Sequence, residues 1–285
     1  MAPSWARYDI WNVAVSALDA PLHDVRQLAA AAPARWMRRQ PAFEFLADPF
    51  PYRDGGREWL LAEHGGHRRD VRGTIVRLDP DDPERPAEPA IARDRHISYP
   101  YTFADADDVY CAPEMSQEGG CVVYRLERGA WRPAHRILPD VRVVDPTFVR
   151  AGGLWWLFCT PAPPRHNSDL RAFFAESLGG PWRPHARDPL KRDLASSRPA
   201  GRPFRIGDRL FRPAQDCSRT YGGAVVVMEI DRLTPTAFAE TLALRLDPDP
   251  RWPFPDGRHH LVVDGSRVYF DAKRIHVDPL LCVKL

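Results

Sequence analysis

A strand–turn–strand pattern occurs five times along the chain, and it limits the fold more than any other feature. The copies are DPFPYRDGGREWLLAE from Asp48, YPYTFADADDVYCAPE from Tyr99, DPTFVRAGGLWWLFCT from Asp145, RPFRIGDRLFRPAQ from Arg202 and HLVVDGSRVYFDAK from His260. Each begins with a polar or aromatic residue and continues as an alternating strand, a turn of Gly or Asp, and a second strand. Their spacing of roughly 50 residues is typical of the blades of a β-propeller.

Further strand candidates lie between the copies and would complete each blade: Gly73–Leu78, Cys121–Leu126, Leu170–Glu176 and Ala224–Ile230. The sequence therefore predicts an all-β fold, a five-bladed β-propeller that forms a single domain over residues 1–285. Tyr8–Val15 is the candidate strand for closing the ring. The 30 prolines and 18 glycines fit a turn-rich chain. One short N-terminal helix is expected within Ala20–Gln40. A β-sandwich with hairpins that look alike by chance is the alternative.

The repeat also points to a site at the centre of the ring. Inner strands of a propeller line its central channel, so the start of each first strand and the end of each second strand should face it. The starts are Asp48, Tyr99, Asp145, Arg202 and His260, and the ends are Glu63, Glu114, Thr160, Gln215 and Lys273. Scaffold positions of a repeat should look alike from blade to blade. These positions differ in charge and type, which favours a binding site built on a repeated frame.

The residue types at these positions suit carbohydrate chemistry. Glycoside hydrolysis uses two carboxyl groups, one of which stays protonated near neutral pH because of apolar or like-charged neighbours. The candidates are Asp48, Glu63, Glu114 and Asp145. Four aromatic residues offer faces on which a sugar ring can stack: Tyr99, Tyr101, Trp155 and Tyr221. Arginine binds carboxylate or phosphate through its planar fork, so Arg198, Arg202 and Arg212 suggest an acidic or phosphate-bearing glycan.

Structural roles are the alternative for each of these residues. An aspartate before proline often caps a turn, although the equivalent positions of Asp48 and Asp145 favour a site. The arginines could pair with carboxylates between blades. The pair His259-His260 is more often structural than metal-binding, and no second histidine cluster has the spacing of a ligand set.

Composition and motifs exclude several classes of function. The 40 basic and 38 acidic residues give a net charge of +2, so no general attraction to nucleic acid or anionic lipid is expected. No phosphate-binding, dinucleotide-binding, serine-hydrolase or zinc-protease motif occurs. MAPSWARYDIW lacks a signal pattern and no 18-residue apolar run exists, so membrane insertion is not expected. Five cysteines without a CxxC pair favour a reduced, cytoplasmic protein.

A series of motifs resembles a known family over roughly Trp11 to Arg274. In order these are WNVAV, ADPFPYRDGG, GTIVRL, HISYPYTF, VYCAPE, VDPTFV with LWWLFCT, RAFFAESLGGPWRPH, SRPAGRPF, LFRPAQDCSRTYGG and MEIDRLT. The series resembles the N-terminal domain of the glucosamine inositolphosphorylceramide transferase type of protein. That domain is itself similar to five-bladed propeller glycosidases, namely arabinanases, β-xylosidases and fructosidases. The transferase activity of the family belongs to a separate C-terminal domain, so it is not carried over.

The resemblance to the glycosidases implies roles for the acidic residues. Asp48 matches their first-blade base or nucleophile, and Asp145 resembles the aspartate that tunes its partner's pKa. The third repeat ends in Thr160 where an acid would be expected, so the available glutamates are Glu114 and Glu63. Glu114 is the predicted general acid of the two, because the VYCAPE segment ends a strongly aromatic strand. His260 resembles a blade-five histidine that some of these enzymes place near a channel metal; no other cofactor is expected. The predicted substrate-binding residues are Glu63, His96, Tyr99, Arg198, Arg202, Arg212, Gln215, Tyr221 and His260.

Two functions follow from the sequence. The leading hypothesis is a glycoside hydrolase-like enzyme acting on a small or acidic glycan. The alternative is a non-catalytic propeller that binds a sugar or phosphosugar and works beside a separately encoded glycosyltransferase.

Overall fold

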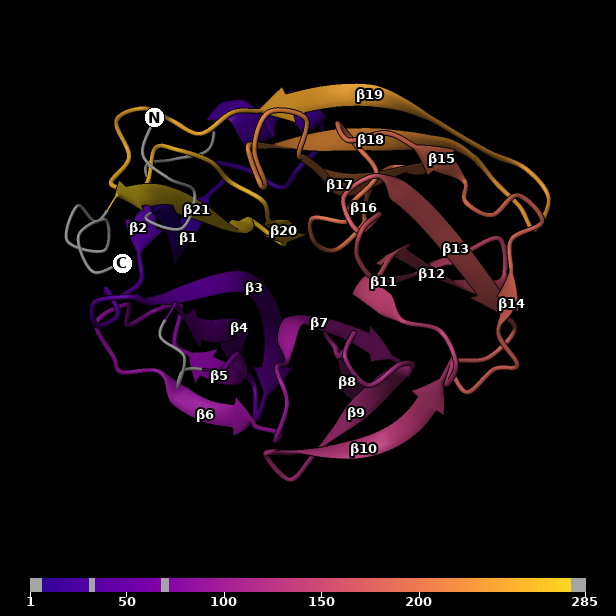
Figure 1. Cartoon of the computed structure of the whole chain (residues 1–285), viewed down its shortest axis with the longest axis horizontal. Coiled ribbons are helices and arrows are strands. Elements are labelled where there is room, and N and C mark those ends of the chain that lie inside the picture. The colour runs from indigo at the N-terminus through magenta and orange to yellow at the C-terminus, as the bar shows by residue number, and fades with distance from the viewer. Residues whose placement is uncertain (1–6, 31–33, 68–71, 278–285) are drawn as a thin grey trace, which may run out of the picture.

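The computed structural model, which describes residues 7–30, 34–67 and 72–277, is a five-bladed β-propeller (Figure 1). Blade one contains β3 (Glu44–Asp54), β4 (Arg57–Gly66), β5 (Thr74–Leu78) and β6 (Glu88–Ile91). Blade two contains β7 (Ser98–Asp105), β8 (Asp108–Glu114), β9 (Cys121–Glu127) and β10 (Ala130–Ile137). Blade three contains β11 (Val143–Ala151), β12 (Leu154–Pro161), β13 (Asp169–Ala175) and β14 (Arg183–Pro184), and β15 (Lys191–Arg192) also pairs with β13.

Blade four contains β16 (Phe204–Ile206), β17 (Arg209–Asp216), β18 (Ala224–Leu233) and β19 (Phe238–Leu246). Blade five is built from both ends of the described chain: β20 (Leu261–Asp264), β21 (Arg267–Val277), β1 (Arg7–Ala17) and β2 (Arg35–Trp36). The five separate antiparallel sheets confirm the predicted propeller and exclude the sandwich. The predicted third strands are β5, β9, β13 and β18.

Blade five closes the ring. β1 pairs antiparallel with β21 along its whole length, from Arg7 opposite Val277 to Ala17 opposite Arg267. The predicted closing strand over Tyr8–Val15 is therefore confirmed. In Figure 1 the indigo β1 and the yellow β21 lie together beside β3 of blade one.

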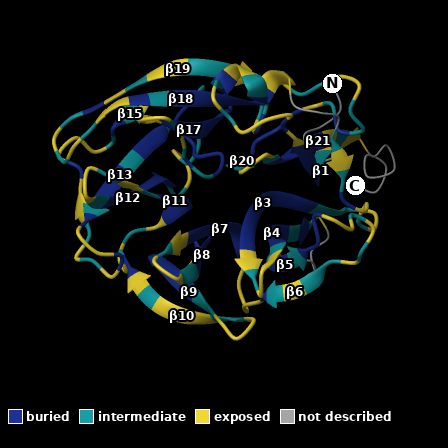
Figure 2. Cartoon of the chain, turned by 180° about the vertical axis from the view of Figure 1, so that it is seen from behind, coloured by how far each residue is buried: buried dark blue, intermediate teal, exposed yellow. Residues whose placement is uncertain are grey.

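Burial follows the position of each strand in its blade. The inner strand β7 is buried through its first six residues, whereas the outer strand β10 is buried only at its last residue (Figure 2). Neighbouring inner strands pack through aromatic rings: the centroid of Phe50 on β3 lies 5.2 Å from that of Tyr101 on β7. Such a core anchors the inner ends of the strands, so the residues at their starts are held firmly around the axis.

The predicted N-terminal helix is a single short 3₁₀ helix, η2 (Val25–Ala30), with Val25 and Leu28 buried. Pro21 and Pro33 flank this segment, and proline interrupts the hydrogen bonds that a longer helix needs. The described part of the chain contains no helix long and apolar enough to cross a membrane.

Cys111, Cys121, Cys159 and Cys217 are buried free thiols. Cys282 lies outside the described residues.

Candidate functional site

Three inner strands share the same backbone kink where they reach the centre of the ring. Asp48, Tyr99 and Asp145 have φ angles of 54°, 44° and 52°. Each precedes a proline, and each lies where the pairing of its strand shifts register. A non-glycine residue in the left-handed region is strained, and proline disfavours a helical conformation in the residue before it. Strain of this kind is concentrated at functional sites, and here it is repeated in three blades.

Two of these kinks are stabilised by a carboxylate on the second strand of the neighbouring blade. The Asp48 N–H donates to Asp271 Oδ2 at 2.9 Å, from β21 of blade five. The Asp145 N–H donates to Glu114 Oε2 at 3.2 Å, from β8 of blade two. Hydrogen bonds to a carboxylate are about twice as strong as neutral ones, so each offsets part of the strain of its kink.

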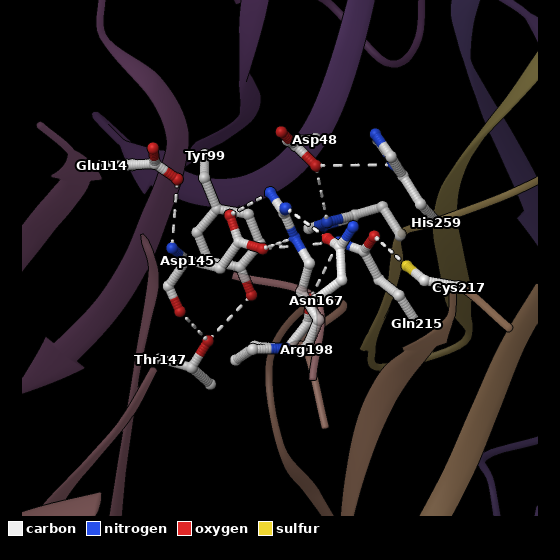
Figure 3. A network of polar contacts seen from close by, with 12 residues as sticks. Asp48, Tyr99, Glu114, Asp145, Thr147, Asn167, Arg198, Gln215, Cys217 and His259 are labelled. Carbon is white, nitrogen blue, oxygen red and sulfur yellow. Dashed lines mark hydrogen bonds and ion pairs between the residues drawn. The ribbon is translucent and has the colours of Figure 1, made fainter. Parts of the chain in front are cut away.

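The kinks bring a group of buried carboxyls together, and Figure 3 shows three of them, Asp48, Glu114 and Asp145, near Arg198. We call this group the acidic centre; its members are Asp48, Glu63, Glu114, Asp145 and Asp271. The side chains of Asp48 and Glu63 each keep 10% exposure, so both reach solvent. The predicted convergence of Asp48, Glu63, Glu114 and Asp145 is therefore seen in the structure.

Asp145 lies against the only arginine of the predicted basic set that reaches the acidic centre. Arg198 donates to it through Nε at 2.7 Å and Nη2 at 3.4 Å, and Gln215 Nε2 lies 3.4 Å from the same carboxylate. Arg198 Nη1 donates to Asn167 Oδ1 at 2.9 Å. Burial raises the pKa of Asp145 to about 7, and the Arg198 charge opposes that rise.

Asp48 lies beside the two consecutive histidines. Its Oδ1 is 3.4 Å from His260 Nδ1 and 3.7 Å from His259 Nδ1. His260 Nε2 is 3.1 Å from the Pro49 carbonyl oxygen, which can only accept, so Nε2 carries a proton. The other nitrogen, Nδ1, has no hydrogen bond and faces Asp48.

Of the five carboxyls in the acidic centre, Glu63 has the fewest favourable partners for a negative charge. Among the described residues its one ion-pair neighbour is His96, whose Nε2 is 3.7 Å from Oε1. Burial, together with the negative charges of Asp48, Glu114 and Asp145, holds the pKa of Glu63 well above its usual range. Glu114 differs because both of its oxygens accept hydrogen bonds, one from Ser116 at 2.8 Å and one from the Asp145 N–H.

Of the four predicted stacking residues, Tyr221 alone is accessible, because Tyr99, Tyr101 and Trp155 are buried. Its side chain is 37% exposed, its ring lies 5.0 Å from the Arg198 guanidinium carbon, and it meets His259 edge-on at 5.3 Å. Tyr99 is fully buried, and its hydroxyl contacts Thr147 Oγ1 at 2.8 Å and accepts from the Gly201 N–H at 2.9 Å. Tyr99 therefore ties the inner strands to one another.

Arg202 and Arg212 are engaged away from the acidic centre. Arg212 pairs with Glu240 on the outer strand β19 at 2.7 Å. Arg202 donates to the carbonyl oxygens of Pro51 at 2.9 Å and Thr102 at 3.1 Å, which lie further along the inner strands. The sequence showed the residue types correctly but gave no means of deciding which face of its strand each arginine occupies.

Two residues of the site escaped the sequence reasoning. Asp271 lies two positions before Lys273 on β21, so the alternation of a strand would have placed both on one face. Asn167 comes from the loop between β12 and β13, where no periodic pattern identifies a site residue.

Asp48, His259 and Asp271 offer one ligand atom each within 4.8 Å of one another, close enough to share a cation. Two carboxylates and an imidazole are a reasonable donor set for a divalent metal. In the structure, however, His259 Nδ1 contacts Asp271 Oδ2 at 2.8 Å, and the ring stacks on Trp11 at 3.7 Å. These two contacts already hold the imidazole in place. Burial lowers the pKa of His259, but the charges of Asp271 and Asp48 outweigh it and raise that pKa overall.

These features define a five-bladed propeller with strained acidic residues at its centre. Solved structures with this fold include a GH43 β-1,3-galactosidase (TM-score 0.55, 12% identity, covering 72% of this chain and 46% of that one). A family 117 glycoside hydrolase from Zobellia galactanivorans has the same TM-score of 0.55 at 12% identity, and the match covers 93% of this chain and 90% of that one. At these identities the likeness shows the fold alone.

The chain belongs to the family described as "Glucosamine inositolphosphorylceramide transferase 1, N-terminal", whose profile matches residues 32–251. A curated relative, Glucosamine inositolphosphorylceramide transferase 1 of Oryza sativa subsp. japonica, is 32% identical over 207 residues. That match covers 69% of this chain but 27% of the rice protein, so the chain spans about a quarter of its relative's length. The resemblance seen in the sequence motifs is confirmed.

Proposed function

We propose that the acidic centre binds a glycan and hydrolyses a glycosidic bond. One observation carries the proposal: a single buried cluster contains a carboxyl whose pKa is raised, Glu63, and a second carboxyl, Asp48, that lies beside two imidazoles. Two carboxyl groups in different protonation states are what glycoside hydrolysis requires. The similar fold of known glycoside hydrolases supports the proposal.

In this proposal Glu63 is the general acid and Asp48 the general base. Glu63 gives its proton to the glycosidic oxygen as the bond from that oxygen to the anomeric carbon breaks. A water molecule attacks the anomeric carbon, and Asp48 takes the proton that the water releases. The products are two sugars with free hydroxyls, and both carboxyls return to their starting states after one proton exchange with solvent.

Contacts favour Glu63 over Glu114, the acid predicted from the sequence. Both oxygens of Glu114 already accept hydrogen bonds, one from Ser116 and one from the Asp145 N–H, whereas the one ion-pair neighbour of Glu63 among the described residues is His96, at 3.7 Å. Glu114 instead fixes the Asp145 backbone, and Asp145 acts on the site through its charge.

Arg198 and Tyr221 supply the remaining parts. The Tyr221 ring offers an exposed face at the edge of the centre, suited to the apolar face of a sugar. Arg198 carries positive charge into a cluster of carboxyls, so it limits the repulsion among them. The charge of Arg198 therefore helps to explain how several carboxyls can be packed inside the ring.

A sugar-recognition module is the second candidate, favoured by the Asp145–Arg198 ion pair. Both groups are buried and bonded to each other, so neither is free to take part in chemistry. The named activity of the curated relatives is that of a transferase, and this chain matches only 27% of the rice protein. In this alternative the propeller binds a sugar or phosphosugar for a glycosyltransferase partner.

A binding and turnover screen separates the two. Uronic acids, furanosides, aminosugars and phosphosugars, free and as glycosides, are tested on the wild type, Asp48→Asn, Glu63→Gln and the exposed control Glu176→Gln. If the site hydrolyses a glycosidic bond, the wild type and the control should release product. Asp48→Asn and Glu63→Gln should still bind the glycoside but turn it over at least about 100-fold more slowly. Binding without product release in all four proteins would support recognition. No binding by any of them would overturn both.

A further inference from the structure

A cavity lies between blades five and one, close to the acidic centre. Its volume is about 310 Å³, within the range of small-molecule sites. Aromatic side chains form much of its wall: Tyr8, Trp11, Phe43 and Phe254. We call it the interblade pocket. No part of the proposed hydrolysis uses it.

The interblade pocket opens at the same end of the blades as the acidic centre. Arg274 and His276 line it and follow Asp271 on β21. Glu44 also lines it, four residues before Asp48 on β3, which is at most about 13 Å along a strand. Trp11 joins the two places directly, because it lines the pocket and its ring stacks on His259 at 3.7 Å.

The charges on the pocket wall are unbalanced. Arg39 and Arg274 line it, both are exposed, and neither has an ion-pair partner among residues 7–30, 34–67 and 72–277. The acidic residue on the wall, Glu44, is already paired with His64 at 2.9 Å. Arg39 instead lies 5.8 Å from the Phe254 ring centre.

We propose that the interblade pocket binds an anionic sugar unit, one that carries a carboxylate or a phosphate. Aromatic rings stack on the sugar, and the two unpaired guanidinium groups take its negative charge. As a description of substrate this rests on the proposed function, since the unit would belong to the glycan whose bond lies at the acidic centre. The proposal that the pocket binds an anionic sugar depends only on the residues of the pocket and not on the proposed hydrolysis.

Calorimetric titration of the intact chain tests the proposal. The ligands are glucuronic acid, glucose 6-phosphate and glucose, and the proteins are the wild type, Arg39→Gln, Arg274→Gln and Asp48→Asn. The control is Arg132→Gln, an exposed arginine on the outer strand β10. The wild type, the control and Asp48→Asn are expected to bind at least one acidic ligand roughly ten-fold more tightly than glucose. Each pocket variant should lose that preference. The stronger of the two acidic ligands shows whether a carboxylate or a phosphate is preferred.

Equal binding of acidic and neutral sugars by the wild type would overturn the proposal. So would an acidic preference that survives in both pocket variants, or one that is lost in Asp48→Asn alone, since the ligand would then lie at the acidic centre. An acidic preference that depends on Arg39 and Arg274, in a protein that releases no product from any glycoside, would uphold this inference while the proposed hydrolysis fails.

Discussion

The backbone N–H of Asp145 donates to the carboxylate of Glu114 across the boundary between blades two and three, at 3.2 Å. The same relationship joins Asp48 to Asp271 between blades one and five. A residue stays in a strained conformation only when contacts with its surroundings hold it there. The acidic centre is therefore a product of blade-to-blade contacts, and no single blade could form it.

Removing the Glu114 carboxylate should destabilise the fold. Glu114→Ala leaves the Asp145 N–H buried without a partner, which costs about 1–3 kcal/mol. Glu114→Gln keeps an acceptor oxygen and should lose less. Denaturant unfolding of both variants, with the exposed Glu176→Ala as the control, measures the difference. Equal stability of Glu114→Ala and the wild type would show that the contact does not hold the kink.

The raised pKa of Glu63 predicts a pH-dependent stability. A carboxyl whose pKa is higher in the folded state binds a proton more readily there, so its stabilisation is complete below the unfolded pKa and is lost as pH rises through the folded value. Glu63→Gln removes this loss. The free energy of unfolding of Glu63→Gln should therefore gain on that of the wild type from pH 5 to pH 9. A constant difference across this range would contradict the raised pKa.

Arg198 should set the titration of Asp145. The carboxyl pKa is about 7, and the guanidinium is the charge that keeps it from rising further. Arg198→Met should move the midpoint upward. Carbon-13 NMR of labelled aspartate carboxyls follows the titration directly, and Arg132→Met serves as the control. A midpoint that falls in Arg198→Met would mean that the pair does not act as the geometry indicates.

Tyr221 should contribute to sugar binding through its ring. Tyr221→Ala is expected to weaken the binding of any sugar found at the acidic centre by about three- to ten-fold, because stacking of an aromatic ring is worth about 0.5–1.5 kcal/mol. Tyr221→Phe keeps the ring and should bind like the wild type. Because the side chain is partly exposed, neither change should alter the melting temperature greatly. Titration calorimetry checks the affinities; the same loss in both variants would assign the effect to the hydroxyl instead.

Much of the fold follows from the sequence because a repeat shows which segments are equivalent. The five hairpins, their completing strands and the closing strand near Tyr8–Val15 could all be located from periodicity and turn residues. The N-terminal segment was harder: an alanine-rich stretch suggests a helix, but flanking prolines reduce it to one 3₁₀ helix.

Less of the site could be predicted, because partner choice depends on contacts between blades. Asp48 and Asp145 stood out by their position before a proline in equivalent copies. Nothing in the order of residues shows that Arg198 reaches Asp145 while Arg212 reaches Glu240. Nor could it show that Glu114 is hydrogen-bonded at both oxygens and Glu63 is not, the difference on which the proposed acid depends.

The pairing of β1 with β21 also bears on how the protein comes to be assembled. Among the described strands β1 is made first and its partner β21 last, so during synthesis Trp11 cannot stack on His259 until the strands between them have been made. Contacts so distant in sequence form slowly, since a long loop must close before they are gained. Asp271 arrives with the same strand and completes the hold on Asp48. During synthesis the carboxyls of the acidic centre therefore stay apart, and all five come together only when β21 pairs with β1 and closes the ring.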